Sequence, residues 1–351
     1  MSLATATGVF HTDYRSQMAL RHTRAEHVRL ALVVAALLVL PFVASPFWLT
    51  VINQIGVAAI GAIGLNILTG FTGQISLGQG GFLAVGAYTS GLLVTRLGLP
   101  TGATVVAAIL FTALVGAFFG LPALRLKGLY LAIATLASQF IILFLVRNWT
   151  AVTGGVGSVV VPQPELLGFS LRGDFRWYWV ILVLAALATL AATNLFRTGI
   201  GRAFVAIRDQ DIAAEVIGVH VWRYKLLAFA ISSGFVGLAG ALTAHYRSIV
   251  TWERFTLEVS ILYLAMIIVG GLGSVAGSIY GAAFMFVLPA YLQQLGRTMR
   301  ASLPVITREL PAIQLGVFGL VIILFLIFEP RGLARIWQRM KDYVRLWPFR
   351  Y

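Results

Sequence analysis

One long stretch without a charged side chain limits most strongly how this chain can fold. Residues 30–95 contain no Asp, Glu, Lys or Arg. Over the whole chain, 59% of residues are hydrophobic and 11% are charged, whereas soluble globular chains carry about 25% charged residues. This composition disfavours a water-soluble enzyme and a nucleic-acid-binding domain. It predicts an all-α, polytopic integral membrane protein.

Charged residues mark the loops, so the apolar runs between them count the predicted crossings. A helix needs about 20 residues to cross the hydrocarbon layer, so residues 30–95 hold about three crossings and residues 259–296 about two. Single crossings are predicted at 97–124, 128–146, 177–196, 226–246 and 310–328. The sequence therefore predicts about ten transmembrane helices. Whether residues 70–95 cross or re-enter the membrane stays open.

The distribution of Lys and Arg predicts the orientation. With a cytoplasmic N-terminus, the predicted cytoplasmic segments hold 17 of the 26 Lys and Arg. An excess of basic residues on that side is the usual topology signal, and it accounts for the net charge of +14 without a nucleic-acid partner. We expect a basic cytoplasmic extension at 1–28, a transmembrane domain at 29–330 and a basic cytoplasmic tail at 331–351.

A glycine-rich, polar segment at 69–81 interrupts two apolar runs and predicts a broken helix. Broken backbone at membrane depth persists only where it is buried in protein or lines a watery cavity, and in transporters it often lies on the solute path. The candidate path residues are Gly70, Gly73, Gln74, Ser76, Gly78 and Gln79, with the intramembrane Asn66 and Gln139. Two alternatives stay open: an ordinary cytoplasmic turn, and interhelical hydrogen bonding by Asn66 and Gln139. Other glycines, such as Gly86, favour close helix packing.

The longest predicted cytoplasmic loop, residues 197–225, predicts two short amphipathic helices. These are expected at about 201–208 and 212–217, with Asp209 or Asp211 as N-cap of the second and Gly218 just past its end, at positive φ. Helices this short are marginal alone and need a partner surface, on this chain or on another protein.

Five ordered motifs carry a resemblance to a known family. The chain resembles the LivM-type permease subunits of bacterial branched-chain amino acid ABC importers over roughly residues 30–335. The motifs lie at 70–82, 125–136, 153–157, 201–218 and 270–277, the last being a second glycine run that faintly echoes the first.

The resemblance implies a multi-pass protein of the inner membrane, with both termini cytoplasmic. Its implied partners are a second, LivH-like permease subunit, two cytoplasmic ATP-binding subunits, a periplasmic solute-binding protein and membrane lipid. Loop 197–225 looks like the EAA coupling loop that docks on the ATPase, although Ile212 stands where that motif has Glu. The residues it points to are Arg208, Asp211, Ala213, Ala214, Glu215 and Gly218.

Several absences restrict the chemistry expected of the chain. The sequence has no Walker A motif, so ATP hydrolysis must be supplied by partner subunits. It has no Cys, and its five His show no metal-ligand spacing, so we expect no enzyme activity, cofactor or metal. The expected function is import of branched-chain amino acids, with urea or short amides as the alternative. An intramembrane enzyme built on His245 and Ser232 or Ser233 is disfavoured, because these residues have no acidic partner. An ion-driven carrier is disfavoured as well, because it would need acidic residues deep in the spans, and the sequence has none there.

Overall fold

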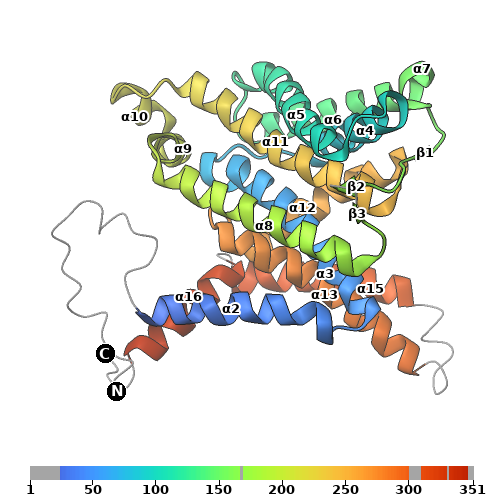
Figure 1. The fold of residues 1–351 in the computed structure, drawn as a ribbon. Coiled ribbons are helices and arrows are strands. Elements are labelled where there is room, and N and C mark those ends of the chain that lie inside the picture. The colour runs from blue at the N-terminus through green and yellow to red at the C-terminus, as the bar shows by residue number, and fades with distance from the viewer. Residues whose placement is uncertain (1–23, 167–168, 300–309, 330–331, 347–351) are drawn as a thin grey trace.

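The structure is a computed structural model that describes residues 24–166, 169–299, 310–329 and 332–346. Helices dominate it (Figure 1). The N-terminal half contains α2 (Arg24–Val43), α3 (Pro46–Asn66), the π-helix η1 (Ile67–Phe71), α4 (Gln79–Leu97), α5 (Thr101–Ala123), α6 (Leu129–Asn148), α7 (Thr150–Thr153), β1 (Val159–Val160), β2 (Glu165–Leu166) and β3 (Phe169–Ser170). The C-terminal half contains α8 (Asp174–Arg197), α9 (Gly199–Asp209), α10 (Asp211–Val216), α11 (Val221–Arg247), β4 (Ile249–Val250), the 3₁₀-helix η2 (Trp252–Phe255), α12 (Leu257–Gly270), α13 (Val275–Met299), α15 (Leu310–Phe328) and α16 (Gly332–Leu346).

The core forms where α3 and α11 pack among the other apolar helices. Ile60 and Leu65 of α3 are fully buried, as are Phe229 of α11 and Met266 of α12. Helix α3 begins with Pro46 at its first turn, where the missing N–H costs nothing, and it continues without a charge to Asn66. The central helices are therefore mostly apolar, as expected for a membrane-embedded core.

Small residues let α4 and α11 approach backbone to backbone. A Cβ on Gly86 would lie 2.4 Å from the carbonyl oxygen of Gly237, and one on Gly240 would lie 2.3 Å from that of Leu83. Close contact of this kind supplies the van der Waals packing that holds helices together in lipid. The expectation of close packing at Gly86 is confirmed.

The predicted number of crossings is not supported, although the all-α polytopic architecture is confirmed. Among the described residues, six helices are long and apolar enough to span a membrane, namely 46–71, 101–122, 129–148, 174–197, 221–247 and 275–296. The remaining predicted crossings coincide with α2, α4, α12 and α15, which lie outside those six. Helix α12, for example, has 14 residues and ends at glycines with positive φ, so it is about 21 Å long against a hydrocarbon core of about 30 Å.

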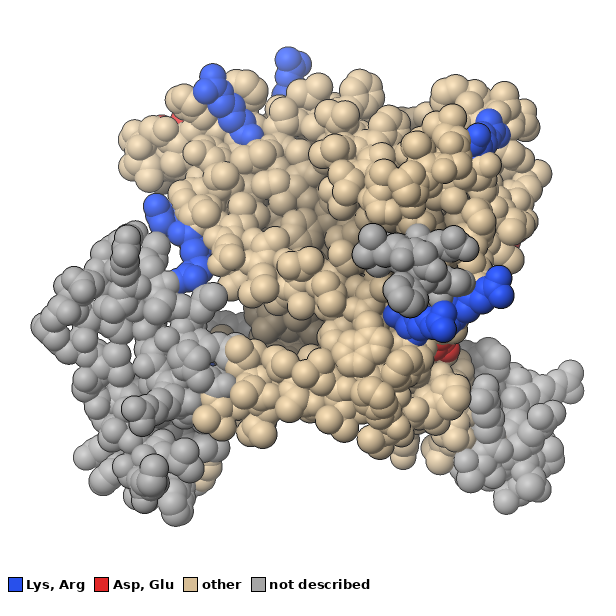
Figure 2. Space-filling model, viewed as in Figure 1, with Lys and Arg blue, Asp and Glu red and all other residues tan. Residues whose placement is uncertain are grey.

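The connecting segments gather at two opposite ends of the helix bundle. Helices α9 and α10 lie at one end, whereas α7 and strands β1, β2 and β3 lie at the other (Figure 1). Strands β1 and β4 pair antiparallel, with Val159 opposite Val250. Between the two ends, one face of the molecule is almost free of charge, and its Lys and Arg side chains lie around the edge (Figure 2). Residues 1–23 of the predicted extension at 1–28 and the last five residues of the predicted tail lie outside the described residues.

Candidate functional site: a broken helix meets a surface loop

The break predicted at 69–81 is confirmed. Helix α3 passes into the π-helix η1, residues 73–78 form a segment without regular helix or strand, called the irregular segment here, and α4 begins at Gln79. Gln74, Ser76 and Gly78 are buried, whereas Gly73 and Ile75 are exposed. The alternation shows that one side of the irregular segment packs into the protein, so it differs from a turn that solvent surrounds.

Asn66, at the end of α3, joins the first glycine segment to the second. Its Nδ2 donates to Ser278 Oγ at 2.8 Å and to the Ser274 carbonyl oxygen at 2.9 Å. Its Oδ1 accepts from the Gly273 N–H at 2.9 Å. A buried amide with these partners is satisfied by its own protein. The geometry therefore agrees with the interhelical alternative for Asn66.

Gln139 and Gln79 also bond between helices. Gln139 Oε1 accepts from Ser260 Oγ at 2.5 Å, and the same hydroxyl oxygen accepts from the Gly80 N–H at 2.8 Å. Gln79 Nε2 donates to the Gly61 carbonyl oxygen at 3.0 Å. These bonds fix the start of α4 against α3, α6 and α12.

Ser76 and Gly78 lie on the buried side of the irregular segment, where it passes α6. The Gly78 N–H donates to Ser76 Oγ at 3.3 Å, and the Leu77 N–H donates to Thr135 Oγ1 of α6 at 2.9 Å. A Cβ on Gly78 would lie 2.9 Å from the Thr135 carbonyl oxygen. The eight candidate path residues are thus spread along α3, η1, the irregular segment, α4 and α6. Two of them, Gly73 and Gln74, line one cavity.

The predicted helices of loop 197–225 are present with slightly different bounds, as α9 and α10. Gly218 has φ +92°, and the Val219 N–H donates to the Ala214 carbonyl oxygen at 3.0 Å, so the predicted helix end is confirmed. The predicted N-cap is wrong. Gln210 occupies that position with φ −161°, because Asp209 ends α9 and Asp211 already belongs to α10.

Helix α10 turns apolar side chains outward. Ile212 is 64% exposed, Val216 82% and Ile217 76%. Ala213 and Glu215 are exposed as well, whereas Ala214 is buried against the protein's own surface. The two exposed apolar side chains of α10, with that of Ile217 directly after it, form an exposed patch of the kind that marks an interaction site.

Two lysines fix α10 at its first residue. Asp211 Oδ2 lies 2.6 Å from Lys127 Nζ, in the α5–α6 loop, and 3.3 Å from Lys225 Nζ, near the start of α11. The hydrogen bond from Lys127, together with Lys225, lowers the pKa of the Asp211 carboxyl below its ordinary value. The sequence prediction missed both lysines. Only their rarity could have pointed to them, since they are two of the three Lys in the chain.

Arg208 brings the surface loop into contact with the broken helix. Its Nη1 donates to the Gly70 carbonyl oxygen at 3.3 Å, and its Nε donates to Asp209 Oδ1 at 2.9 Å. A Cβ on Gly73 would lie 3.2 Å from Arg208 Cγ. Two sets of residues that were predicted separately are thus adjacent. No spacing in the sequence indicated this contact, because 138 positions separate its partners.

The comparisons with known proteins agree with this architecture. The family described as branched-chain amino acid transport system / permease component matches residues 47–326. The high-affinity branched-chain amino acid transport system permease protein LivM of Escherichia coli K12 is 33% identical over 87% of this chain and 75% of its own length. The probable LivM of Methanocaldococcus jannaschii is 27% identical, over 68% of this chain and 69% of its own length. LivH of E. coli is 24% identical, over 66% of this chain and 80% of its own length. No solved structure matches the chain. Since the family covers most of the chain, including the broken helix and the surface loop, the chain belongs to the permease components of branched-chain amino acid transport systems.

Proposed function

We propose that this chain is the membrane-spanning permease subunit of an ATP-driven importer of branched-chain amino acids. The observation that carries the proposal is the contact between Arg208, on the loop with the exposed apolar helix, and Gly70, on the broken helix. Such a contact lets movement of a docked partner reach the membrane segment. The family match and the LivM relatives support branched-chain amino acids over the alternative of urea or short amides.

The partners follow from the same reasoning. We assign loop 197–225 as the coupling loop, and the patch formed by Ile212, Val216 and Ile217 as its contact with one of two cytoplasmic ATP-binding subunits. The similarity to LivH supports a second, homologous permease subunit beside this one. A periplasmic solute-binding protein would deliver the amino acid to the opposite end, where β1 and β4 pair.

The coupling residues have different roles in this proposal. Arg208 and Asp211 link the loop to the membrane helices, Gly218 ends α10, and Ala213 and Glu215 are exposed for docking. Ala214 is buried, so it supports the loop from inside.

The solute path would follow the irregular segment 73–78. Gly70, Gly73, Gln74, Ser76 and Gly78 form or border it, while Asn66, Gln79 and Gln139 hold its two ends in place. The path residues would act mainly through backbone groups and small side chains, and the chain would have no catalytic role of its own.

The membrane arrangement completes the proposal. Residues 29–330 would form the permease domain in the inner membrane, and the segments at 1–28 and 331–351 would be cytoplasmic. Helices α2, α4, α12 and α15 would lie within the membrane together with the six helices long enough to span it, without each having to cross fully.

Uptake into proteoliposomes tests the proposed function. The chain would be reconstituted with its second permease and ATP-binding subunits, with ATP inside and the binding protein with labelled leucine or labelled urea outside. We expect ATP-dependent accumulation of leucine but not of urea. Uptake of urea in place of leucine would favour the alternative, and ATP-independent leucine uptake would contradict an ATP-driven importer.

A further inference from the structure

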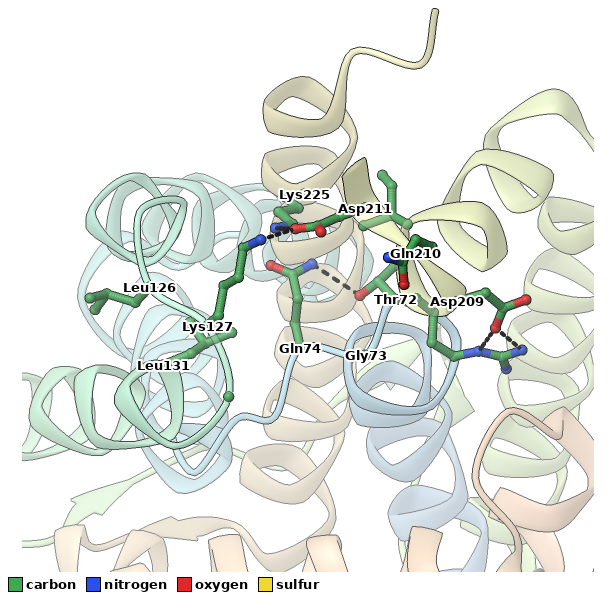
Figure 3. Close-up of a pocket in the computed structure, with 13 residues that line it drawn as sticks. Thr72, Gly73, Gln74, Leu126, Lys127, Leu131, Asp209, Gln210, Asp211 and Lys225 are labelled. Atoms are coloured by element: carbon green, nitrogen blue, oxygen red, sulfur yellow. Dashed lines mark hydrogen bonds and ion pairs between the residues drawn. The ribbon is translucent and has the colours of Figure 1, made fainter. Parts of the chain in front are cut away.

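A small cavity lies where the broken helix meets three other parts of the chain. We name it the junction cavity; its volume is about 220 Å³. Pockets for drug-sized ligands measure roughly 300–1,000 Å³, so this one suits a smaller molecule. The residues that line it and carry the argument are Gln74, Leu131, Ile207, Lys127, Asp211 and Lys225, some of them visible in Figure 3.

One side of the junction cavity has hydrogen-bond donors to spare. Lys127 Nζ and Lys225 Nζ both contact the same oxygen, Oδ2 of Asp211. Each ammonium group has three donor hydrogens, and the contact with Asp211 uses one from each. Two positive charges facing one carboxylate leave this side positive, so it suits the carboxylate group of a ligand.

Next to this lysine pair lies a buried acceptor that lacks a donor. Gln74 is 3% exposed, and its Nε2 donates to Thr72 Oγ1 at 3.0 Å. Its Oε1 has no hydrogen-bond partner among the described residues. Figure 3 shows the Gln74 amide between Thr72 and the Lys127–Asp211 pair. A buried carbonyl oxygen without a donor is unfavourable, so this atom suits a ligand N–H group.

Apolar side chains complete the lining. Leu131, at the start of α6, is buried, and so is Ile207 of α9. The junction cavity thus combines a positive side, a lone acceptor and an apolar wall. The molecule that matches all three carries a carboxylate, an ammonium group and an aliphatic side chain.

We propose that the junction cavity is a binding site for a free aliphatic α-amino acid that enters from the cytoplasm. The carboxylate lies at Lys127 and Lys225, the ammonium group donates to Gln74 Oε1, and the side chain packs on Leu131 and Ile207. The cytoplasmic side of entry rests on the proposed function, which makes this molecule the transported product.

Occupancy of the junction cavity would restrain the transporter. The ligand would connect the irregular segment, the α5–α6 loop, α9 and the start of α11. Arg208 already links α9 to η1, next to the irregular segment, and Asp211 links α10 to the α5–α6 loop and α11. If import requires the coupling loop to move relative to the broken helix, a molecule bound between them opposes that movement. Accumulated product would then slow its own import.

Equilibrium binding to the purified complex, without the solute-binding protein, tests the site directly. We expect labelled leucine to bind with an affinity of about millimolar. Isocaproate, which lacks the ammonium group, and isoamylamine, which lacks the carboxylate, should each bind at least tenfold more weakly. No leucine binding at about 10 mM, or equal binding of all three probes, would overturn the proposal.

Two variants locate the site within the complex. Lys127→Gln removes a charge from a side chain that is 66% exposed, and Gln74→Leu removes the acceptor. Each should weaken leucine binding at least tenfold, while Arg125→Gln, an exposed neighbour on the same loop outside the lining, should not. Retained binding in Lys127→Gln complex that elutes as an intact assembly would contradict the site.

Uptake separates this proposal from the proposed function. Leucine uptake into proteoliposomes that start without internal leucine tests the importer alone. Preloading the lumen with leucine should slow initial uptake several-fold compared with preloading with isocaproate. If uptake is ATP-dependent but insensitive to internal leucine, the regulatory role fails and the importer stands; if no uptake occurs in either case, the proposed function fails.

Discussion

Replacing Asn66 by alanine should destabilise the fold and not merely weaken solute binding. The change removes two hydrogen bonds donated by Nδ2, to Ser274 and Ser278, and one accepted from the Gly273 N–H. Side-chain hydrogen bonds between membrane helices average about 0.6 kcal/mol each, so three contribute about 2 kcal/mol. The Gly273 N–H left without an acceptor adds about 1–3 kcal/mol. We therefore expect the free energy of unfolding to fall by about 3–5 kcal/mol.

Unfolding of the purified chain by SDS in mixed micelles, followed by tryptophan fluorescence, measures this loss. The matched control is Asn148→Ala, because Asn148 is exposed and its Nδ2 donates to the Phe144 carbonyl oxygen of its own helix. The control should change the unfolding free energy by less than about 0.5 kcal/mol. A similarly small change for Asn66→Ala, together with a large rise in the KM for leucine, would place Asn66 on the solute path and refute the structural assignment.

Three further predictions concern the loop and its contacts. In whole cells, Cys at Gln210 should resist an impermeant maleimide while Cys at the exposed Val160 reacts, and labelling of both from outside would reverse the assigned topology. Gly73→Ala and Gly98→Ala each put an alanine at positive φ, which destabilises the fold by about 1–2 kcal/mol. Only Gly73 lies next to Arg208, so only Gly73→Ala should also lower leucine-stimulated ATP hydrolysis. Because the lysines lower the Asp211 pKa, the ion pair stabilises the protein at neutral pH and this stabilisation is lost as pH falls through the lowered pKa. The stability difference between wild type and Asp211→Asn should therefore be constant from about pH 8 to 5 and shrink below about pH 4, and a constant difference down to pH 2 would contradict the pair.

The sequence was most informative where one physical requirement dominates. Charge-free runs predict apolar helices, since a charge inside lipid is costly, and ten of the helices described lie where such runs predict them. Charge-free runs alone do not show which of these helices are long and apolar enough to cross. The 14-residue α12 ends at Gly270, and the start of α4 is polar, and neither helix is among the six described helices long and apolar enough to span a membrane.

The candidate site was predictable in parts but not as an assembly. Glycine spacing predicts both the break near Gly73 and the helix end at Gly218, because each position has a positive φ that other residues avoid. The hydrogen bond from Arg208 to Gly70 and the ion pair of Lys127 with Asp211 depend on tertiary packing, which the spacing of residues along the sequence does not reveal.

Cross-linking measures most directly whether the exposed face of α10 is where an ATP-binding subunit docks. The chain has no Cys, so a single Cys at Val216 can be joined to lysines of the ATP-binding subunit by a thiol-to-amine reagent in the assembled complex. A Cys at Ile249, exposed on β4 at the opposite end, serves as the control. We predict a covalent adduct with the ATP-binding subunit from position 216 and none from position 249. A complex that co-purifies intact but gives no adduct from position 216, or equal adducts from both, would contradict the docking assignment.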